Sequence, residues 1–269
     1  DMHTACLISK NGKNWLDRCG CWCLAYGHRP QAKGVEMAAN EDDEDVVVDA
    51  SVRRSRAEFV FEALLKAIVR VDRRPGDLLL KDDIARELGV SRQPVTDAIN
   101  RLAGLGLVTV IPQVNSYVSR ISPADVIESS FLRSAVEAQI VHELASHPKS
   151  AVVTALRNQL LEQVQLVAAG DVDGFHDADD AFHRMLVELA GLPGLWDQIA
   201  AARLHLVRVR RLGLPRPGRL AISYAEHSMV VDEIEAGRPR KAANTIAHHI
   251  RYNEGELRRL QKDLPQYFL

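Results

Sequence analysis

The amino-acid sequence predicts a mainly α-helical protein in two parts: a helical segment with one small β-hairpin, and then a segment made of helices only. Apolar residues recur at helical spacing along most of residues 58–262. The period changes to that of β-strands only between Leu107 and Ile121. Glycine and proline then divide the rest of the chain into six periodic segments, at about residues 123–147, 149–169, 173–190, 194–212, 218–236 and 239–262. The second part is therefore predicted to be an all-α bundle of six helices.

The composition fits a two-domain globular protein. The chain has 269 residues, of which 46% are hydrophobic and 26% charged, and this length is sufficient for two separate cores. The sequence lacks a run of about 18 apolar residues, so no membrane span is expected. Its opening residues do not have the pattern of a signal peptide. We therefore expect a cytoplasmic protein with no membrane partner.

The charge is unevenly distributed along the chain. The formal net charge is −2, but residues 51–121 carry 12 Lys/Arg and 8 Asp/Glu. A modestly basic segment on an acidic body suits contact with DNA, although a randomly uneven surface gives the same imbalance.

The first 50 residues stand apart from the periodic pattern. They contain all four cysteines, Cys6, Cys19, Cys21 and Cys23. The spacing C-x-C-x-C differs from the C-x-x-C pairs of common zinc sites, and no second ligand cluster is nearby. Met37, which is followed by an acidic run, would make a credible beginning. We expect residues 1–50 to be a disordered or non-native extension and exclude them from the fold.

Three helical segments precede the hairpin. The first runs from Glu58 to Val71 with a single apolar stripe, and the turn residues Arg74–Asp77 end it. The second covers Lys81–Leu88 and ends at Gly89, where left-handed backbone costs least. The third follows Ser91, which is well placed to cap it. Its apolar positions fall on one side and leave a polar outer face.

Two helices joined by a short glycine-containing turn, the second with a polar outer face, form a helix-turn-helix. The β-rich runs 107–111 and 116–121 flank Pro112–Asn115 and predict a hairpin, which completes a winged helix. We expect the outer face of the third helix and the wing to bind DNA. The residues assigned to this contact are Arg92, Gln93, Thr96, Asn100, Arg101 and Asn115.

Motifs in both parts of the chain resemble those of GntR-type repressors. In the first part the likeness lies in Pro75-Gly76-Asp77, Ile84–Val95, Arg101-Leu102, Gly106-Leu107-Val108, Pro112-Gln113-Val114 and Tyr117-Val118. The second part resembles the FCD ligand-binding domain of the fatty-acid-responsive branch, through Arg133 with Glu137, Asp179 with Phe182-His183, Glu226-His227 and His249-Ile250. The resemblance covers about residues 57–260. It implies a DNA-binding domain at 51–121 and a six-helix effector domain at 122–269.

The chain departs from this family pattern at two positions. The family commonly has an arginine where Thr96 stands, so the recognition helix loses a charge that can reach guanine with two hydrogen bonds. The family also commonly has glycine at the position of Asn115. Asparagine tolerates positive φ better than other residues, so we expect the wing turn to be kept. DNA binding is expected to persist with an altered operator preference or a lower affinity.

A set of histidines in the second part predicts a metal site. Asp179 and His183 are i and i+4 on one helix and therefore point the same way. His227 and His249 lie on two later helices, and packing could bring all four together. Three imidazoles and a carboxylate suit Zn²⁺, Ni²⁺ or Mn²⁺, and the resemblance implies the same four ligands.

Other interpretations of these histidines stay open on the sequence alone. The chain has ten histidines, so the set could be scattered over the surface. Asp180 could be the ligand in place of its neighbour, although i+3 to His183 fits the pattern less well. His248 is turned about 100° from the adjacent histidine on a helix, so only one of the two can face inward.

Arg133 is the candidate effector-binding residue. A guanidinium matches a carboxylate in geometry and could hold an anionic ligand. Equally, Arg133 could form an i,i+4 salt bridge with Glu137 on its own helix.

These features predict a dimeric transcriptional repressor, not an enzyme, that reads a palindromic operator. A small carboxylate or sugar acid, bound at or near the metal, would modulate operator binding. A metal-dependent hydrolase is the rival, but no motif places a general base, and no catalytic residue is assigned. A third interpretation is a DNA-binding protein whose metal is purely structural.

Overall fold

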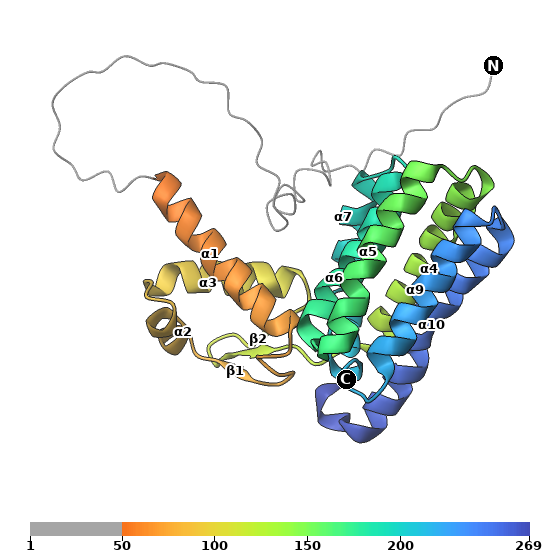
Figure 1. The fold of residues 1–269 in the computed structure, drawn as a ribbon. Coiled ribbons are helices and arrows are strands. Elements are labelled where there is room, and N and C mark those ends of the chain that lie inside the picture. The colour runs from red at the N-terminus through yellow and green to blue at the C-terminus, as the bar shows by residue number, and fades with distance from the viewer. Residues whose placement is uncertain (1–49) are drawn as a thin grey trace, which may run out of the picture. The chain divides into compact units, whose positions relative to one another are not determined.

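The computed structural model describes residues 50–269, coloured in Figure 1. Met37 and the four cysteines, on which the expectations for residues 1–50 depend, lie outside this range. In the described part, no helix is both long enough and apolar enough to cross a membrane.

The winged helix forms from three helices and a three-stranded antiparallel sheet. Its elements are α1 (Ala50–Val69), β1 (Leu78–Leu79), α2 (Lys81–Glu87), α3 (Arg92–Gly104), β2 (Val108–Val110) and β3 (Ser116–Val118). Strand β3 lies between the other two, with Tyr117 opposite Leu78 and Val118 opposite Val108. Strand β1 is not predicted from the sequence, because two residues are too few to establish a period.

The core of this part lies between α1 and α3. The apolar stripe predicted for the first helix faces the apolar side of the recognition helix, and the members of this core are fully or almost fully buried. They are Val60, Phe61, Leu64, Ile68, Val95, Ala98, Ile99 and Leu102. The outer face of α3 is thereby fixed, since its inner side has no other place to pack.

Two local expectations about this part are wrong in detail. Ser91 occupies the N-cap position of α3 with extended backbone, but its side chain makes no capping hydrogen bond. In the wing, the left-handed residue is Gln113 (φ 60°) and not Asn115. Pro112 precedes it, and Val114 N donates to Ile111 O at 3.1 Å. Proline at the second position and positive φ at the third, which is Gln113, are together typical of a type II turn.

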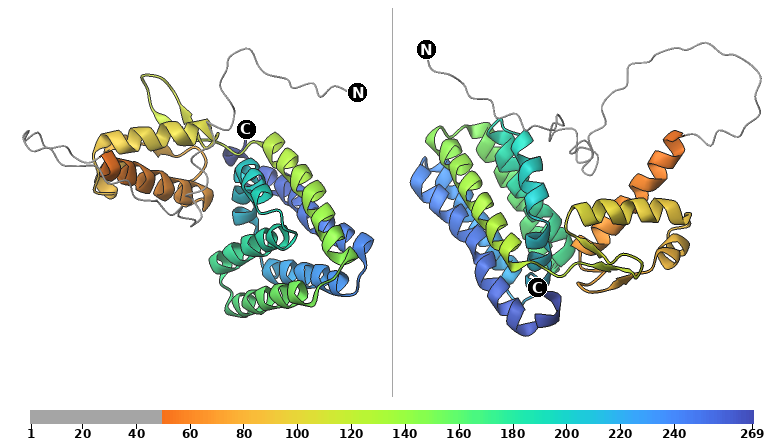
Figure 2. Two further views of the ribbon diagram at one scale, coloured as in Figure 1. Left: turned by 90° about the horizontal axis from the view of Figure 1, so that it is seen from above. Right: turned by 180° about the vertical axis from the view of Figure 1, so that it is seen from behind.

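The second part is helical throughout, and the predicted fold class is confirmed. Its helices are α4 (Pro123–Ser146), α5 (Ser150–Ala169), α6 (Val172–Leu189), α7 (Gly194–Ala202), α8 (Leu204–Gly213), α9 (Arg219–Glu235) and α10 (Pro239–Asp263), followed by a 3₁₀ turn at Pro265–Tyr267. Helix α10 packs along α4 and α9, and α5 packs against α6 and α9 (Figure 2). The space among these helices holds the site described below.

The fourth predicted segment of the bundle is divided into α7 and α8. The break falls at Arg203 (φ −98°, ψ 7°), whose guanidinium pairs with both oxygens of Asp180 at 2.6 and 2.9 Å and lies over the ring of Trp196. Ser129 Oγ lies 2.5 Å from Ala202 O at the end of α7 and equally close to Asp125 O of its own helix, and its single hydrogen can go to either carbonyl. Neither glycine nor proline marks this break, so the sequence pattern runs through it.

Arg101, predicted to lie on the outer face of α3, packs against α1 instead. Its guanidinium donates to the two carboxylate oxygens of Glu58 at 2.8 and 3.2 Å. It also lies 3.7 Å from the ring centroid of Phe61. These contacts hold the two main helices of the winged helix together.

We therefore expect Arg101→Ala to lower the free energy of unfolding by about 1–2 kcal/mol, because a half-buried ion pair, a cation–π contact and the packing of the side-chain stem are lost together. Urea denaturation followed by circular dichroism measures the change. Arg92→Ala, on the exposed start of the same helix, serves as the control and should change the free energy by less than about 0.5 kcal/mol. Equal effects of the two substitutions would contradict a structural role for Arg101.

Candidate metal centre and DNA-binding face

Four side chains from three helices of the bundle meet at one buried point. Asp179 and His183 lie one turn apart on α6, His227 is on α9, and His249 is on α10. One candidate ligand atom from each lies within 4.8 Å of the others, and all four residues are buried. The structure thus brings together the four residues assigned from the sequence to a metal.

Each histidine ring is held from its outer side by an oxygen acceptor. The Nδ1 contacts are Glu137 Oε2 for His183 (2.5 Å), Gln163 Oε1 for His227 (2.8 Å) and Glu226 Oε2 for His249 (2.7 Å). An acceptor at Nδ1 fixes the hydrogen on that nitrogen and leaves the Nε2 lone pair for the other side of the ring. Three lone pairs are therefore aimed into the cluster.

The cluster fits a divalent cation on two observations. The Nε2 atoms of His227 and His249 lie 3.2 Å apart, and two unprotonated nitrogens at this distance repel each other unless a positive charge lies near both. Among the described residues, the buried Asp179 Oδ1 and His183 Nε2 have no hydrogen-bond partner. Three neutral nitrogens and one anionic oxygen form a ligand set that Zn²⁺, Ni²⁺ or Mn²⁺ accepts.

The protonation states also suit metal binding, which requires deprotonated ligands. Burial alone raises the pKa of Asp179, but the Arg210 guanidinium and then the histidines hold it well below its ordinary value. Burial lowers the pKa of His183, and it lowers that of His227 to well below the usual value. At neutral pH the carboxylate is thus ionised and these two imidazoles are neutral.

The alternative ligands raised from the sequence lie outside the cluster. Asp180 is paired with Arg203 and Arg210. His248 is exposed, as expected for a residue turned away from the adjacent histidine. His176 is buried with neither ring nitrogen hydrogen-bonded in the described part of the chain, and burial lowers its pKa to about 3.

Arg133 forms the salt bridge that was one of its two predicted roles. Its Nε donates to Glu137 Oε1 at 2.7 Å, and both side chains are buried. The other oxygen of Glu137 holds His183, so Arg133 is connected to the cluster through this carboxylate. Burial raises the pKa of Glu137, but Arg133 and His183 outweigh it and bring the value to about 2. The effector-binding role of Arg133 stays a prediction.

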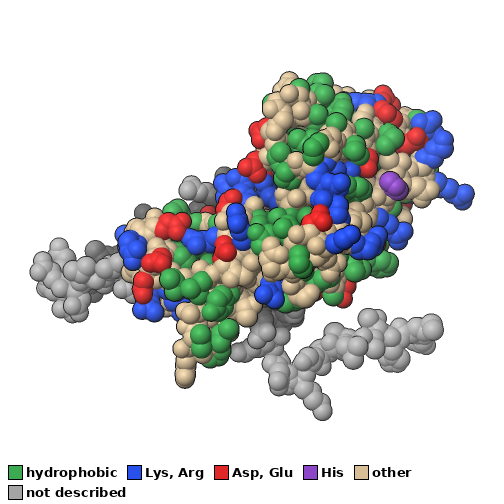
Figure 3. Space-filling view, turned by 90° about the horizontal axis from the view of Figure 1, so that it is seen from below, with side chains coloured by type: hydrophobic (Ala, Val, Ile, Leu, Met, Phe, Trp, Pro, Cys, Tyr) green, Lys and Arg blue, Asp and Glu red, His purple; other side chains and the backbone are tan. Residues whose placement is uncertain are grey.

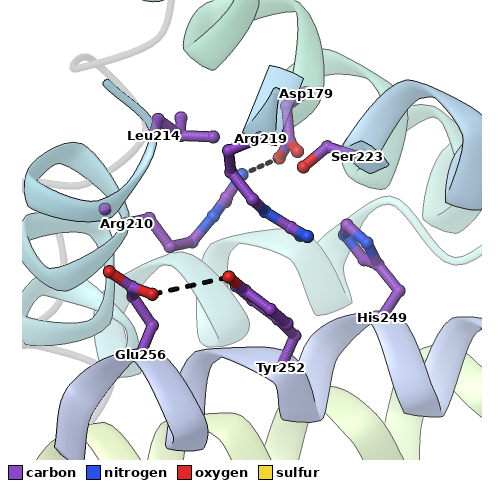
Figure 4. Close-up of a pocket in the computed structure, with 9 residues that line it drawn as sticks. Asp179, Arg210, Leu214, Arg219, Ser223, His249, Tyr252 and Glu256 are labelled. Carbon is purple, nitrogen blue, oxygen red and sulfur yellow. Dashed lines mark hydrogen bonds and ion pairs between the residues drawn. The ribbon is translucent and has the colours of Figure 1, made fainter. Parts of the chain in front are cut away.

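A small pocket opens beside the cluster, and it is lined by charged side chains (Figure 4). The lining residues are Asp179, Arg210, Gly213, Leu214, Arg219, Ser223, His249, Tyr252 and Glu256. The guanidinium of Arg219 lies 3.7 Å from the ring centroid of Tyr252, and its Nη2 donates to Glu226 Oε2 at 3.1 Å. Its Nη1 is buried and has no hydrogen-bond partner among the described residues.

Arg210 and Arg219 were not identified from the sequence. Arg210 pairs with the ligand Asp179 and with Asp180. One signal for Arg219 was available: it is the first residue of α9, where a positive side chain opposes the helix dipole.

The residues predicted to bind DNA lie on α3 and the wing. Arg92, Gln93 and Asn100 are exposed, and Thr96 is half-buried with its Oγ1 donating to Arg92 O at 3.2 Å. Asn115 lies at the base of the wing turn, where its carbonyl accepts from Ile111 N at 2.8 Å.

Acidic neighbours reduce the charge of this face. Arg92 lies 3.5 Å from Asp82, and Gln93 Nε2 donates to Asp97 Oδ1 at 2.9 Å. On the side of the molecule seen in Figure 3, basic side chains are interspersed with acidic and apolar ones.

Two family models match the chain. Residues 56–118 match the model described as bacterial regulatory proteins, gntR family, and residues 128–252 match the FCD domain. The first match spans the winged helix, and the second contains all four residues of the cluster.

Known proteins similar to this chain are regulators of transcription. An HTH-type transcriptional regulator in an unstable DNA locus of Streptomyces ambofaciens is 34% identical over 80% of this chain and 90% of its own length. The HTH-type transcriptional repressor RspR of Escherichia coli is 26% identical over 78% of this chain and 92% of its own. Two solved structures share the fold. A putative GntR transcriptional regulator from Rhodococcus sp. RHA1 has a TM-score of 0.62 and 23% sequence identity, and E. coli McbR/YncC has a TM-score of 0.63 and 17% identity. Each match covers 76% of this chain and 97% of the other chain.

We expect the full-length protein, stripped with chelator and then given Zn²⁺, to bind about one ion per chain. At 100 times the dissociation constant the ion should stabilise the fold by about 2.7 kcal/mol, which raises Tm by roughly 5–10 °C. His183→Ala should weaken Zn²⁺ binding more than about 100-fold, since loss of an outer-sphere partner alone costs 10–100-fold.

Elemental analysis and thermal denaturation measure these effects. The matched control is His248→Ala, which removes an exposed histidine next to His249 on α10 and should leave both quantities unchanged. Full zinc loading of the His183 variant would rule out this cluster as the metal centre.

Proposed function

Because this chain belongs to the GntR family of regulatory proteins and carries an FCD domain, we propose that it is a transcriptional repressor controlled by a small organic acid that binds beside a divalent metal. Membership makes it a DNA-binding regulator and not an enzyme. We assign DNA binding to residues 51–121 and effector binding to 122–269. The effector half of the proposal depends on one observation: Asp179 Oδ1 and His183 Nε2 are buried in the cluster without a hydrogen-bond partner among the described residues, next to a pocket lined by Arg210 and Arg219.

The metal would be held by Asp179, His183, His227 and His249 and, when bound, would offer its open coordination positions to an oxygen of the acid. Arg219 supports the choice of an acid, because its buried Nη1 lacks an acceptor and a carboxylate supplies one. Arg210 lines the same pocket and already pairs with a carboxylate. A neutral sugar would leave both charges without a new partner, so a carboxylate or sugar acid is the favoured class.

For DNA, we propose a homodimer that places two α3 helices about one helical turn apart on a palindromic operator. The exposed side chains Arg92, Gln93 and Asn100 would face the bases and phosphates. Thr96 lacks the two-pronged reach of arginine, so the operator is expected to differ from those of relatives with arginine there.

A purely structural metal is the second candidate, and the high burial of the cluster favours it. The two proposals differ in one respect. In the regulatory case an acid changes operator affinity, which requires that it bind one arrangement of the protein better than another. In the structural case the acid has no effect, and loss of metal lowers stability alone.

Operator binding tests the DNA half of the proposal. Arg92→Ala should weaken binding to DNA selected by the protein from a randomised pool by about 1–3 kcal/mol, because an exposed guanidinium that reads a base edge is lost. Fluorescence anisotropy at fixed salt gives the affinities. The control is Arg240→Ala, an exposed arginine on α10, which should bind like the unaltered protein. Equal affinities for all three proteins would remove Arg92 from the contact.

The effector half is tested with Zn²⁺-loaded protein and two probes, citrate and gluconate. At least one probe should change operator affinity by about 5-fold or more, the lower end of usual allosteric coupling. Arg219→Gln should retain zinc and operator binding but lose most of this response, because the pocket loses its unpaired guanidinium nitrogen. Arg240→Gln is the matched control. A response of full size in the Arg219 variant would exclude this pocket as the acid site.

A further inference from the structure

Helix α8 contacts both the candidate metal centre and the backbone that leads out of the winged helix. At one end of the helix, Arg210 pairs with the ligand Asp179. Two residues earlier, Arg208 Nη2 donates to Ser119 O at 2.6 Å. Ser119 belongs to the segment 119–122, here called the linker, which joins β3 to α4.

His205, one turn before Arg208 on α8, makes two further contacts of this kind. Its Nδ1 accepts from the backbone N–H of Ser122 at 3.2 Å, and its Nε2 faces Gly106. Gly106 has φ 73° and lies between α3 and β2, where a side chain on it would stand 3.7 Å from the imidazole. The same helix is therefore hydrogen-bonded to the linker and lies against the glycine that follows the recognition helix.

Arg208 is an unusual residue for this position because its charge lacks a carboxylate partner in the described part of the chain. The side chain is 0% exposed, and Nε and Nη1 have no hydrogen-bond partner among the described residues. Burial lowers its pKa to about 10. A buried charge without its hydrogen bonds is costly, so a shift of α8 that gave these nitrogens an acceptor or water would be favoured.

Apolar packing makes the linker follow α8. Ile121 is buried in one cluster with Leu206 and Val209 of α8 and with Phe268. Its backbone is held as well, since Ile121 N donates to Tyr267 O at 2.8 Å and Leu269 N donates to Ile121 O at 3.1 Å. A displacement of α8 therefore reaches the linker through side chains and backbone together.

Through Arg210, α8 would also respond to the metal centre, because this guanidinium pairs with Asp179. This carboxylate divides its charge between the candidate ion and Arg210, so an ion on one oxygen weakens the pull on the guanidinium. An acid in the pocket would compete for the same guanidinium, because Arg210 lines it. Either event changes the balance of forces on α8.

We propose that α8 transmits the state of the metal centre to the linker and the recognition helix, and that Arg208 is the positioning residue on which this transmission depends. The inference rests on the proposed function, since it takes the cluster to bind a metal. It assigns the route by which occupancy of the cluster would alter DNA binding, and it places that route in one short helix.

Hydrogen–deuterium exchange of the full chain, stripped with chelator and measured with and without Zn²⁺, tests the inference without DNA. In the unaltered protein, Zn²⁺ should slow exchange in α6, α9 and α10 and change exchange of residues 117–122 by about 5-fold or more. Arg208→Gln should keep the first effect and reduce the second below about 2-fold. Removing this unpaired charge should not destabilise the fold.

If the Arg208 variant folds poorly, His205→Gln tests the same transmission, because it removes the hydrogen bond from Ser122 N to the imidazole. Arg240→Gln is the control for the loss of an arginine. A full Zn²⁺ response at residues 117–122 in both α8 variants would overturn the inference. So would an unaltered protein in which α6, α9 and α10 respond and the linker does not. Absence of any response in those three helices would refute the metal centre, and the inference with it, whereas failure to bind DNA would refute only the proposed regulator.

Discussion

The second part of the chain depends on one electrostatic constraint: three imidazole lone pairs and a carboxylate converge at one buried point. The outer nitrogen of each ring is fixed by an acceptor, so no ring can turn its lone pair away without breaking a buried hydrogen bond. The ligands come from α6, α9 and α10, while Glu137 on α4 and Gln163 on α5 hold two of the rings. Side chains from α4, α5, α6, α9 and α10 therefore pack around the buried Asp179 carboxylate and the three imidazoles.

The same constraint explains why α8 contacts the cluster through Arg210. Asp179 has two oxygens in a buried place, and a cation in the cluster can neutralise only part of its charge, so Arg210 covers the other side. Arg210 is also drawn to Asp180, which anchors Arg203 at the break between α7 and α8. The break therefore does not loosen the bundle. It lets α8 be a separate element that contacts the carboxylate pair through Arg210 and the linker through His205 and Arg208.

The sequence was informative where a feature depends on neighbours along the chain, and silent where it depends on packing. The pairing of Asp179 with His183 follows from helical spacing, but their meeting with His227 could be inferred only from the family resemblance. Arg92 and Arg101 are both polar positions of one helix in sequence, and they differ because Glu58 lies opposite only one of them. The helix break at Arg203 and the placement of Arg219 were also missed, because both depend on contacts with other helices.

The acidic neighbours of the recognition face bear on how the two halves of the proposed dimer would have to be placed. Arg92 and Gln93 each lie beside a carboxylate, and the family's arginine is replaced by Thr96, so one half-site gains little from displacing counterions. In the proposed dimer, affinity for an operator would then depend on both recognition helices binding at once. This gain depends on the effective concentration of the second helix at its half-site, which falls steeply when the spacing is wrong. In the proposed dimer, a small movement of the linker would therefore change operator affinity even if α3 kept its own structure.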